Sequence, residues 1–263
     1  MAITDKLKSI GNSIRAKTGK TQLIPLSTMA EEVENVYETG KEEIINFFRS
    51  SSDWSYFFYY DARTEFLPFF DENITANGEF FEYMFFHGGQ VNPFVEFPAS
   101  LNTSLGIAFN GMFKDCWIQK LPLIDTKNAR EMNEMFYNSS VVETIPKLDF
   151  SCCTAADNIF IGCNNLKNIT IEPRSINISG LDFSDCTKLT KESLTSIMYG
   201  LNPDIGDEYV EGKYTLTLSE AAISKAFETI EGGNDGLYTQ EWDDLMYGFH
   251  YKGDGWFWDI WII

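Results

Sequence analysis

Four phenylalanines recur at a nearly constant interval through the middle of the chain, and this spacing restricts the folds open to it. Successive members lie 23, 24 and 23 residues apart. They are Phe113, Phe136, Phe160 and Phe183. A small residue follows each of them by three positions, namely Cys116, Ser139, Cys163 and Cys186. A repeat of this length predicts similar units, each packed on its neighbours.

Each unit has a consistent internal order that predicts its local structure. Met135 and Phe136 are apolar and suit a core, and an Asn-Ser pair then turns the chain. An extended piece through Ile145 follows and ends at Pro146, a residue tolerated at a sheet edge. One strand per unit would pair with its neighbours into a continuous parallel sheet. Phenylalanine on such a period is expected in the core.

The repeat extends backwards through a looser, aromatic-rich region. Phe85 and Phe57 continue the series towards the N-terminus, each at a somewhat longer spacing than the regular members show. We therefore predict about six coils over residues 49–189, because end units of a repeat are expected to diverge. The predicted fold class is α+β, a β-solenoid with helices at both ends.

Residues 1–48 are predicted to be a helical attachment segment. Ile3, Leu7, Ile10 and Ile14 mark one face of an amphipathic helix over residues 3–18. Thr28 and Glu31 form a capping box for a second helix, which carries Val33 and Val36. Two short helices make too small a core to stand alone. We expect them to dock on the rest of the chain, on a second copy or on a larger assembly.

Residues 190–263 are predicted to cap the last repeat. The apolar pattern predicts a helix over 190–201, a strand over 214–218 and a helix over 221–227. The tail from Phe257 to Ile263 is too apolar to lie in water. It is either a closing strand of the same chain or a contact with another copy or a partner. We favour the closing strand.

Charge and composition exclude several classes of function. The net charge is −19, from 39 acidic and 20 basic residues, and the basic residues form no dense cluster. Nucleic acid and anionic membranes are therefore not expected partners. The N-terminus has no apolar signal core and no stretch is long enough to span a bilayer. We expect a protein that is neither exported by a classical signal nor anchored in a membrane.

The residues that usually carry chemistry are sparse. Three of the five cysteines share one repeat position, which indicates small buried side chains and no disulfide framework. Cys152 and Cys153 are adjacent and lack metal-ligand spacing, and His87 and His250 are the only histidines. No carboxylate pair or phosphate-binding loop stands out. We expect no metal, no cofactor and no catalytic residue.

One aromatic group is a candidate for carbohydrate binding. Its members can stack on sugar rings, although packing in the core or cap is the reading we favour. They are Trp54, Tyr56, Tyr59 and Tyr60.

The N-terminal segment resembles a known module. Ile14-Arg15-Ala16-Lys17-Thr18-Gly19, followed by Met29-Ala30-Glu31-Glu32-Val33, is similar to a segment that begins many phage and prophage structural proteins of Gram-positive hosts. The resemblance covers about the first 36 residues. It implies a virion protein associated with a tail or fibre. The candidate attachment residues are Leu7, Ile10, Ile14, Met29, Val33 and Val36.

The repeats resemble a second family. The pattern Met-Phe-x-x-Cys/Ser, then Leu-x-x-Ile/Leu-Pro, then Leu-Asp-Phe/Thr is similar to BspA-type leucine-rich repeats over residues 109–190. That family occurs on bacterial surface proteins and in phage tail proteins and mostly serves binding. The resemblance implies a leucine-rich-repeat-like solenoid and supplies no catalytic residue.

These readings together predict a non-enzymatic phage virion protein, in a tail, fibre or surface decoration, whose repeats recognise the host cell. The expected partners are other virion proteins at the N-terminal helices and a glycan or protein of the host surface. The resemblance also implies a homo-oligomer, with trimers common among fibres. The alternatives are a bacterial adhesin with the same repeats and a tail enzyme that degrades polysaccharide. Tail and capsid locations are both open.

Overall fold

The computed structural model describes residues 45–46, 48–61, 71, 73–89, 99–118, 120–203, 213–227, 240–250 and 258–263. The elements in chain order are the 3₁₀ turn η1 (Tyr59–Asp61), β1 (Thr144–Leu148), β2 (Asn168–Ile171), β3 (Leu181–Phe183), α3 (Lys191–Gly200), β4 (Thr215–Leu218), α4 (Glu220–Ala226), α5 (Gln240–His250) and β5 (Asp259–Ile262). The two helices expected before residue 37 lie outside the described residues.

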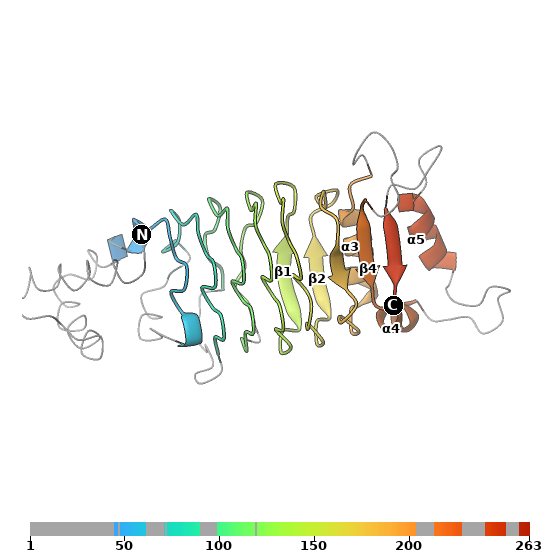
Figure 1. Ribbon diagram of the computed structural model, residues 1–263, viewed down its shortest axis with the longest axis horizontal. Helices are drawn as coiled ribbons and strands as arrows, with labels where there is room; N and C mark the ends of the chain where they lie inside the picture. The colour runs from blue at the N-terminus through green and yellow to red at the C-terminus, as the bar shows by residue number, and fades with distance from the viewer. Residues whose placement is uncertain are drawn as a thin grey trace, which may run out of the picture.

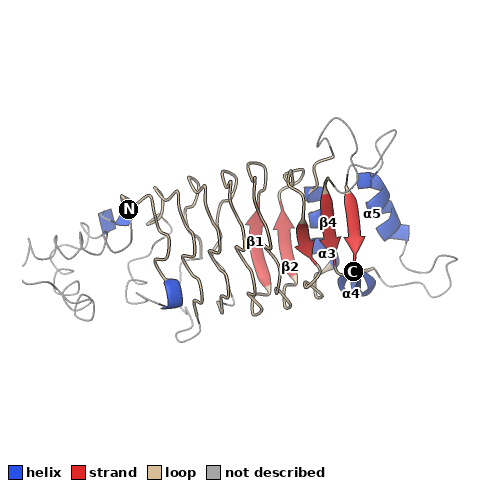
Figure 2. Cartoon of the chain, viewed as in Figure 1, coloured by secondary structure: helices blue, strands red, loops and turns tan. Residues whose placement is uncertain are grey.

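The predicted fold class, an α+β leucine-rich-repeat-like β-solenoid of about six coils, is wrong. The described residues form a mixed α/β arrangement in which the strands make two short, separate parallel sheets. One sheet contains β1 and β2, and the other has the order β3-β4-β5. The expected continuous sheet with one strand per unit is therefore not present among the described residues. Figure 2 shows strands only from β1 onwards, with loops and short helical segments before it.

The described parts of the early repeats are joined by turns and by isolated parallel bridges, among them Asp53–Phe80 and Ser100–Leu123, which are too short to form strands. Tyr56, Tyr83 and Glu134 have φ between 53° and 60°, and so do residues four positions later such as Tyr60 and Asn138. A residue with such a φ is not extended, so no strand can run through it. Neighbouring repeats instead meet turn to turn. The Figure 1 ribbon shows these segments side by side in chain order.

Backbone hydrogen bonds join these turns at regular intervals. The N–H of Phe58 donates to the carbonyl of Met84 at 2.8 Å. The N–H of Phe85 donates to Met112 at the same distance, and corresponding bonds follow in later repeats. These bonds satisfy buried main-chain groups that a sheet ladder would otherwise pair.

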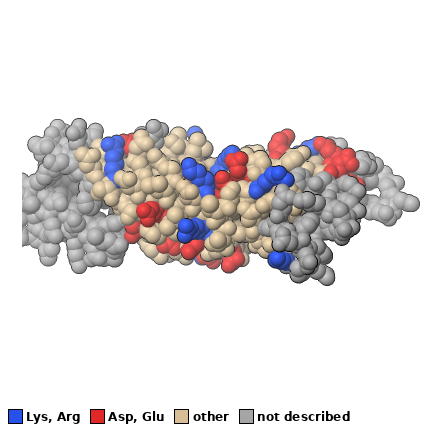
Figure 3. Space-filling model, turned by 90° about the horizontal axis from the view of Figure 1, so that it is seen from above, with Lys and Arg blue, Asp and Glu red and all other residues tan. Residues whose placement is uncertain are grey.

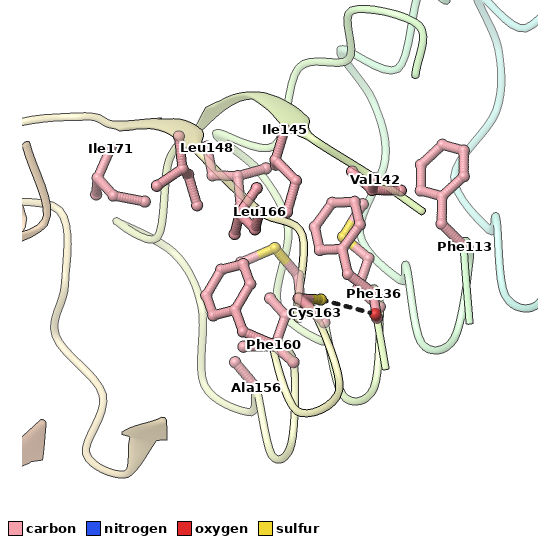
Figure 4. Close-up of a cluster of buried hydrophobic side chains, with 14 of the residues drawn as sticks. Phe113, Phe136, Val142, Ile145, Leu148, Ala156, Phe160, Cys163, Leu166 and Ile171 are labelled. Carbon is pink, nitrogen blue, oxygen red and sulfur yellow. Dashed lines mark hydrogen bonds between the residues drawn. The ribbon is translucent and has the colours of Figure 1, made fainter. Parts of the chain in front are cut away.

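The recurring phenylalanines form one buried column, as their predicted core role requires. Phe113, Phe136, Phe160 and Phe183 are all 0% exposed, and successive ring centroids lie 5.7, 6.1 and 4.3 Å apart. The rings are nearly parallel, with interplanar angles of 4°, 4° and 20°. Figure 4 shows three of these rings among the aliphatic side chains around them. Offset stacking adds to the stabilisation from burial.

The column continues to Phe85 and Phe58, not to Phe57. The ring of Phe58 stacks on Phe85 at 5.4 Å, and Phe85 stacks on Phe113 at 5.2 Å. Phe57 instead packs edge-on against Trp54 at 5.2 Å and Phe48 at 5.7 Å. The predicted assignment of Phe57 to the repeat was therefore wrong by a single position.

A second column contains the small residue of each repeat. The Sγ of Cys163 lies 3.1 Å from the carbonyl oxygen of Phe136, the contact dashed in Figure 4. Ser139 occupies the preceding place, and its hydroxyl donates to the carbonyl of Phe113. Burial raises the pKa of the Cys163 thiol to about 12. All five cysteines are free thiols, and Cys152 alone among them is exposed.

The C-terminal part has the expected helix, strand and helix as α3, β4 and α4, and its tail is a strand of the same chain. Residues Asp259 to Ile262 pair in parallel with Thr215 to Leu218. Trp258 is 1% exposed, and its indole N–H donates to the carbonyl of Asn202 at 3.0 Å. The sequence reading missed α5, which places Trp242 against Phe227 at 5.0 Å.

Candidate functional site: an aromatic edge

Three of the four sequence candidates lie in one turn. Asp53 starts it, because its Oδ1 accepts the N–H of Ser55 at 2.9 Å and bends the chain. Tyr56 and Tyr60 then adopt left-handed backbone, with φ of 60° and 53°. Tyr56 is 44% exposed and Tyr60 57% exposed, while Tyr59 is half-buried.

Trp54 does not share this surface. Its side chain is 1% exposed and packs against Phe57 and Phe48. The indole therefore belongs to the core.

The three tyrosines stack on three side chains of the next repeat. Tyr56 lies on Tyr83 at 5.2 Å, and Tyr59 lies on Phe86 at 5.0 Å. Tyr60 lies on the imidazole of His87 at 4.6 Å, with 10° between the planes. We call this group the aromatic edge; it consists of Tyr56, Tyr59, Tyr60, Tyr83, Phe86 and His87. Stacking covers one face of each tyrosine ring.

The sequence did not identify Tyr83, Phe86 and His87 as members of the aromatic edge. Each of these residues follows its stacking partner by the same number of positions in the sequence. That interval also separates Phe58 from Phe85, so the corrected repeat register would have found all three pairs.

The same turn of the following repeats is polar. Lys114 lies 2.6 Å from Glu134 and 4.8 Å from the ring centre of Tyr137. Asp115 accepts the side-chain amide of Asn138 at 2.5 Å and lies 3.8 Å from Nε2 of His87. The edge thus changes from aromatic to charged along the molecule.

Neighbouring groups shift the pKa values of Lys114, Tyr56 and Tyr59. Partial burial alone would lower the pKa of Lys114, but its hydrogen bond and charge interaction with Glu134 outweigh burial and raise that pKa. Desolvation raises the pKa of Tyr56, and the nearby Tyr83 and Glu82 add to the effect. Desolvation also raises the pKa of Tyr59. These two phenols therefore keep their protons at neutral pH and can both donate and accept hydrogen bonds.

A separate hollow of about 590 Å³ lies beside β1. Leu121, Leu123, Val141 and Pro146 give it an apolar lining, to which Lys120, Glu143 and Thr144 add polar groups. Pro146 has no N–H and so cannot donate a hydrogen bond across to the neighbouring repeat. The lining holds no nucleophile paired with a base.

The structure bears on the remaining sequence predictions, which concern attachment residues, metal sites and membrane spans, as follows. The attachment candidates Leu7, Ile10, Ile14, Met29, Val33 and Val36 lie outside the described residues. Within the described part of the chain, no group of three or more His, Cys, Asp or Glu side chains could hold a metal ion. No helix there combines the length and apolar character needed to cross a bilayer. Figure 3 shows charged side chains of both signs scattered among uncharged ones on one face.

Comparisons of the chain with protein-family models, with curated proteins and with solved structures found no match.

Proposed function

We propose that this chain is a non-enzymatic structural protein of a phage virion, in a tail, fibre or surface decoration, and that its repeats recognise the host cell. The observation that carries the recognition role is the aromatic edge. The virion assignment rests on the resemblance of residues 14–19 and 29–33 to a phage structural module.

The aromatic edge suits recognition for physical reasons. Tyrosine offers a large amphipathic contact area and loses little conformational entropy on binding. Here the rings are already stacked, so a ligand would meet side chains that are largely ordered beforehand. The phenols, together with Lys114 and Asp115, provide hydrogen-bond donors and acceptors of the kind that sugar hydroxyls require. A glycan of the host surface is therefore the proposed ligand.

The proposal divides the chain into three parts. Residues 1–48 attach to other virion proteins, with Leu7, Ile10 and Ile14 on the contact face. Residues 49–189 present the repeats, and residues 190–263 close their C-terminal end. A homo-oligomer, such as the trimers common among fibres, would multiply weak contacts with the host.

Binding of the full chain to purified Gram-positive wall polysaccharides, measured by calorimetry, tests the recognition role. We expect Tyr60→Ala to weaken binding about tenfold or more, because it removes an exposed ring that stacks on His87. Tyr199→Ala is the control, since Tyr199 is 53% exposed and lies on α3. Equal effects of the two substitutions would contradict the proposed site.

The virion assignment and the lack of enzymatic activity need separate measurements. Mass spectrometry of gradient-purified particles should find the chain among their proteins, and its absence would refute the virion role. Release of reducing ends from the same polysaccharides would show an enzyme instead.

A further inference from the structure

Among the described residues, β5 is the edge strand of the C-terminal sheet. The order β3-β4-β5 leaves one side of β5 without a partner strand among the described residues. The helix α5 packs on α3 and, through Trp242, on Phe227. Figure 1 shows β5 as the last strand at this end of the stack of repeats.

The hydrogen bonds to β4 fix which main-chain groups point outwards. The N–H of Asp259 donates to Tyr214, and the N–H of Ile263 donates to Leu218. The carbonyl of Ile263 accepts from Glu220. Because main-chain groups alternate along a strand, the N–H and C=O groups of Ile260 and Ile262 face the open side.

The side chains of β5 also alternate. Ile260 and Ile262 are half-buried and pack against the core. Trp261 is 57% exposed and Ile263 is 66% exposed. The strand contains no lysine or proline, the residues that usually protect an edge from pairing. An exposed edge with this composition favours the addition of another strand.

We propose that β5 pairs antiparallel with β5 of a second copy of this chain, across a two-fold axis at Trp261. The strand is self-complementary in this register. Ile260 of one copy would lie opposite Ile262 of the other, and each pair would exchange both of its main-chain hydrogen bonds. The two Trp261 side chains would then face each other at a position without hydrogen bonds, where cross-strand side chains come closest.

Charge predicts how this dimer responds to salt. Asp259 is the only charged residue of β5, and in this register it lies opposite the apolar Ile263. The rest of the chain is strongly acidic, with a net charge of −19, so two copies repel each other at low ionic strength. Screening by salt therefore strengthens the association.

The test compares two matched substitutions in the full chain by sedimentation equilibrium and light scattering. Trp261→Lys places two ammonium groups face to face at the axis and should raise the dissociation constant at least about tenfold. Trp117→Lys is the control, because Trp117 is 52% exposed and lies far from β5 in the sequence. Circular dichroism and thermal unfolding check that both variants fold like the parent.

The expected result is a parent and a Trp117→Lys variant with a mass above 30.0 kDa, and a Trp261→Lys variant with a lower mass or weaker association. In a Cys152→Ser background, Trp261→Cys should form a disulfide between copies, because facing Cα atoms about 4.5 Å apart fit that bond. A parent that is monomeric at every concentration and salt level would overturn the proposal. Association that Trp261→Lys and Trp117→Lys leave equally intact would also overturn it.

Discussion

At the scale of single residues, the aromatic edge stops where Gly111 replaces a tyrosine in the next repeat. Gly111 has a φ of +59° and takes the left-handed place that Tyr83 holds one repeat earlier. A Cβ added to Gly111 would lie 2.4 Å from Cε1 of Tyr83, so the tyrosine ring covers the glycine. Tyr83 thus has Tyr56 on one side and bare backbone on the other.

Gly111→Ala should destabilise the fold for two reasons, which are strain in the left-handed backbone and displacement of the Tyr83 ring. The left-handed backbone alone costs about 1 to 2 kcal/mol in alanine, and displacing Tyr83 from its stack adds about 1 to 3 kcal/mol. Gly180→Ala is the matched control, because Gly180 has a φ of +83° and no atom within 4 Å of an added Cβ. Urea unfolding measures both, and equal losses would show that Tyr83 moves aside freely.

The buried thiols predict a loss of stability at alkaline pH. Desolvation raises the pKa of Cys163 from 9.0 to about 12 in the folded chain. Since the folded pKa lies above the unfolded one, this contribution is complete below pH 9.0 and is lost as the pH rises towards 12. Near pH 10.5 the loss for one such thiol is about 2 kcal/mol.

Cys163→Ser should therefore make the alkaline loss of stability smaller. Serine already occupies the equivalent place as Ser139, so the substitution suits the site. Denaturant unfolding at neutral and at alkaline pH compares the variant with the parent. The same pH dependence in both proteins would rule out ionisation of this thiol as a cause.

At the scale of elements, one serine joins α3 to β2. Ser193 is 2% exposed, and its hydroxyl oxygen accepts the N–H of Ile169 at 3.0 Å. The same hydroxyl donates to the carbonyl of Lys167 at 3.0 Å. In this way the helix provides hydrogen-bond partners for main-chain N–H and C=O groups that a neighbouring strand would otherwise pair.

Ser193→Ala should lower the free energy of unfolding by about 1 to 3 kcal/mol, because it leaves the buried N–H of Ile169 without this acceptor. The carbonyl of Lys167 still accepts the N–H of Thr190 at 2.9 Å. Thr195→Ala in the same helix is the control, as Thr195 lies two positions further on and is only half-buried. Thermal and urea unfolding measure the difference. A Ser193→Ala variant as stable as the control would show that water or rearranged backbone replaces the hydroxyl.

The elements differ in how far the sequence could predict them. The helix α3, the strand β4 and the helix α4 follow from apolar periodicity, which tertiary packing here reinforces. The strands expected in the early repeats are replaced, among the described residues, by isolated parallel bridges such as Ser100–Leu123. The sequence also showed no sign that Tyr56, Tyr83 and Glu134 adopt left-handed backbone in the turns, because non-glycine residues rarely do. The helix α5 was not predicted, because its Trp242 was grouped with the tryptophans of the apolar tail. Trp242, Leu245 and Met246 do have helical spacing.

At the scale of the whole molecule, the sequence period was a good guide to contacts and a poor guide to fold class. It identified the phenylalanine column from Phe113 to Phe183, because large apolar side chains on a fixed interval are best buried against one another. It could not reveal that turns and isolated bridges take the place of strands in the described residues of the early repeats. Tyr56, Tyr59 and Tyr60 were candidates from the sequence, although packing was favoured for them, and their stacking partners required the corrected register.

The burial of sulfur has a consequence for the chemical durability of this protein. The side chains of Met84, Met112, Met132, Met135 and Met198 are 0% exposed. Cys163 and Cys186 are equally covered, and Cys152 is the exposed thiol of the five. Oxidants attack accessible thiolates and thioethers, and methionine sulfoxide disrupts the core that contains it. Air oxidation of the folded chain should therefore modify few of these sulfur atoms.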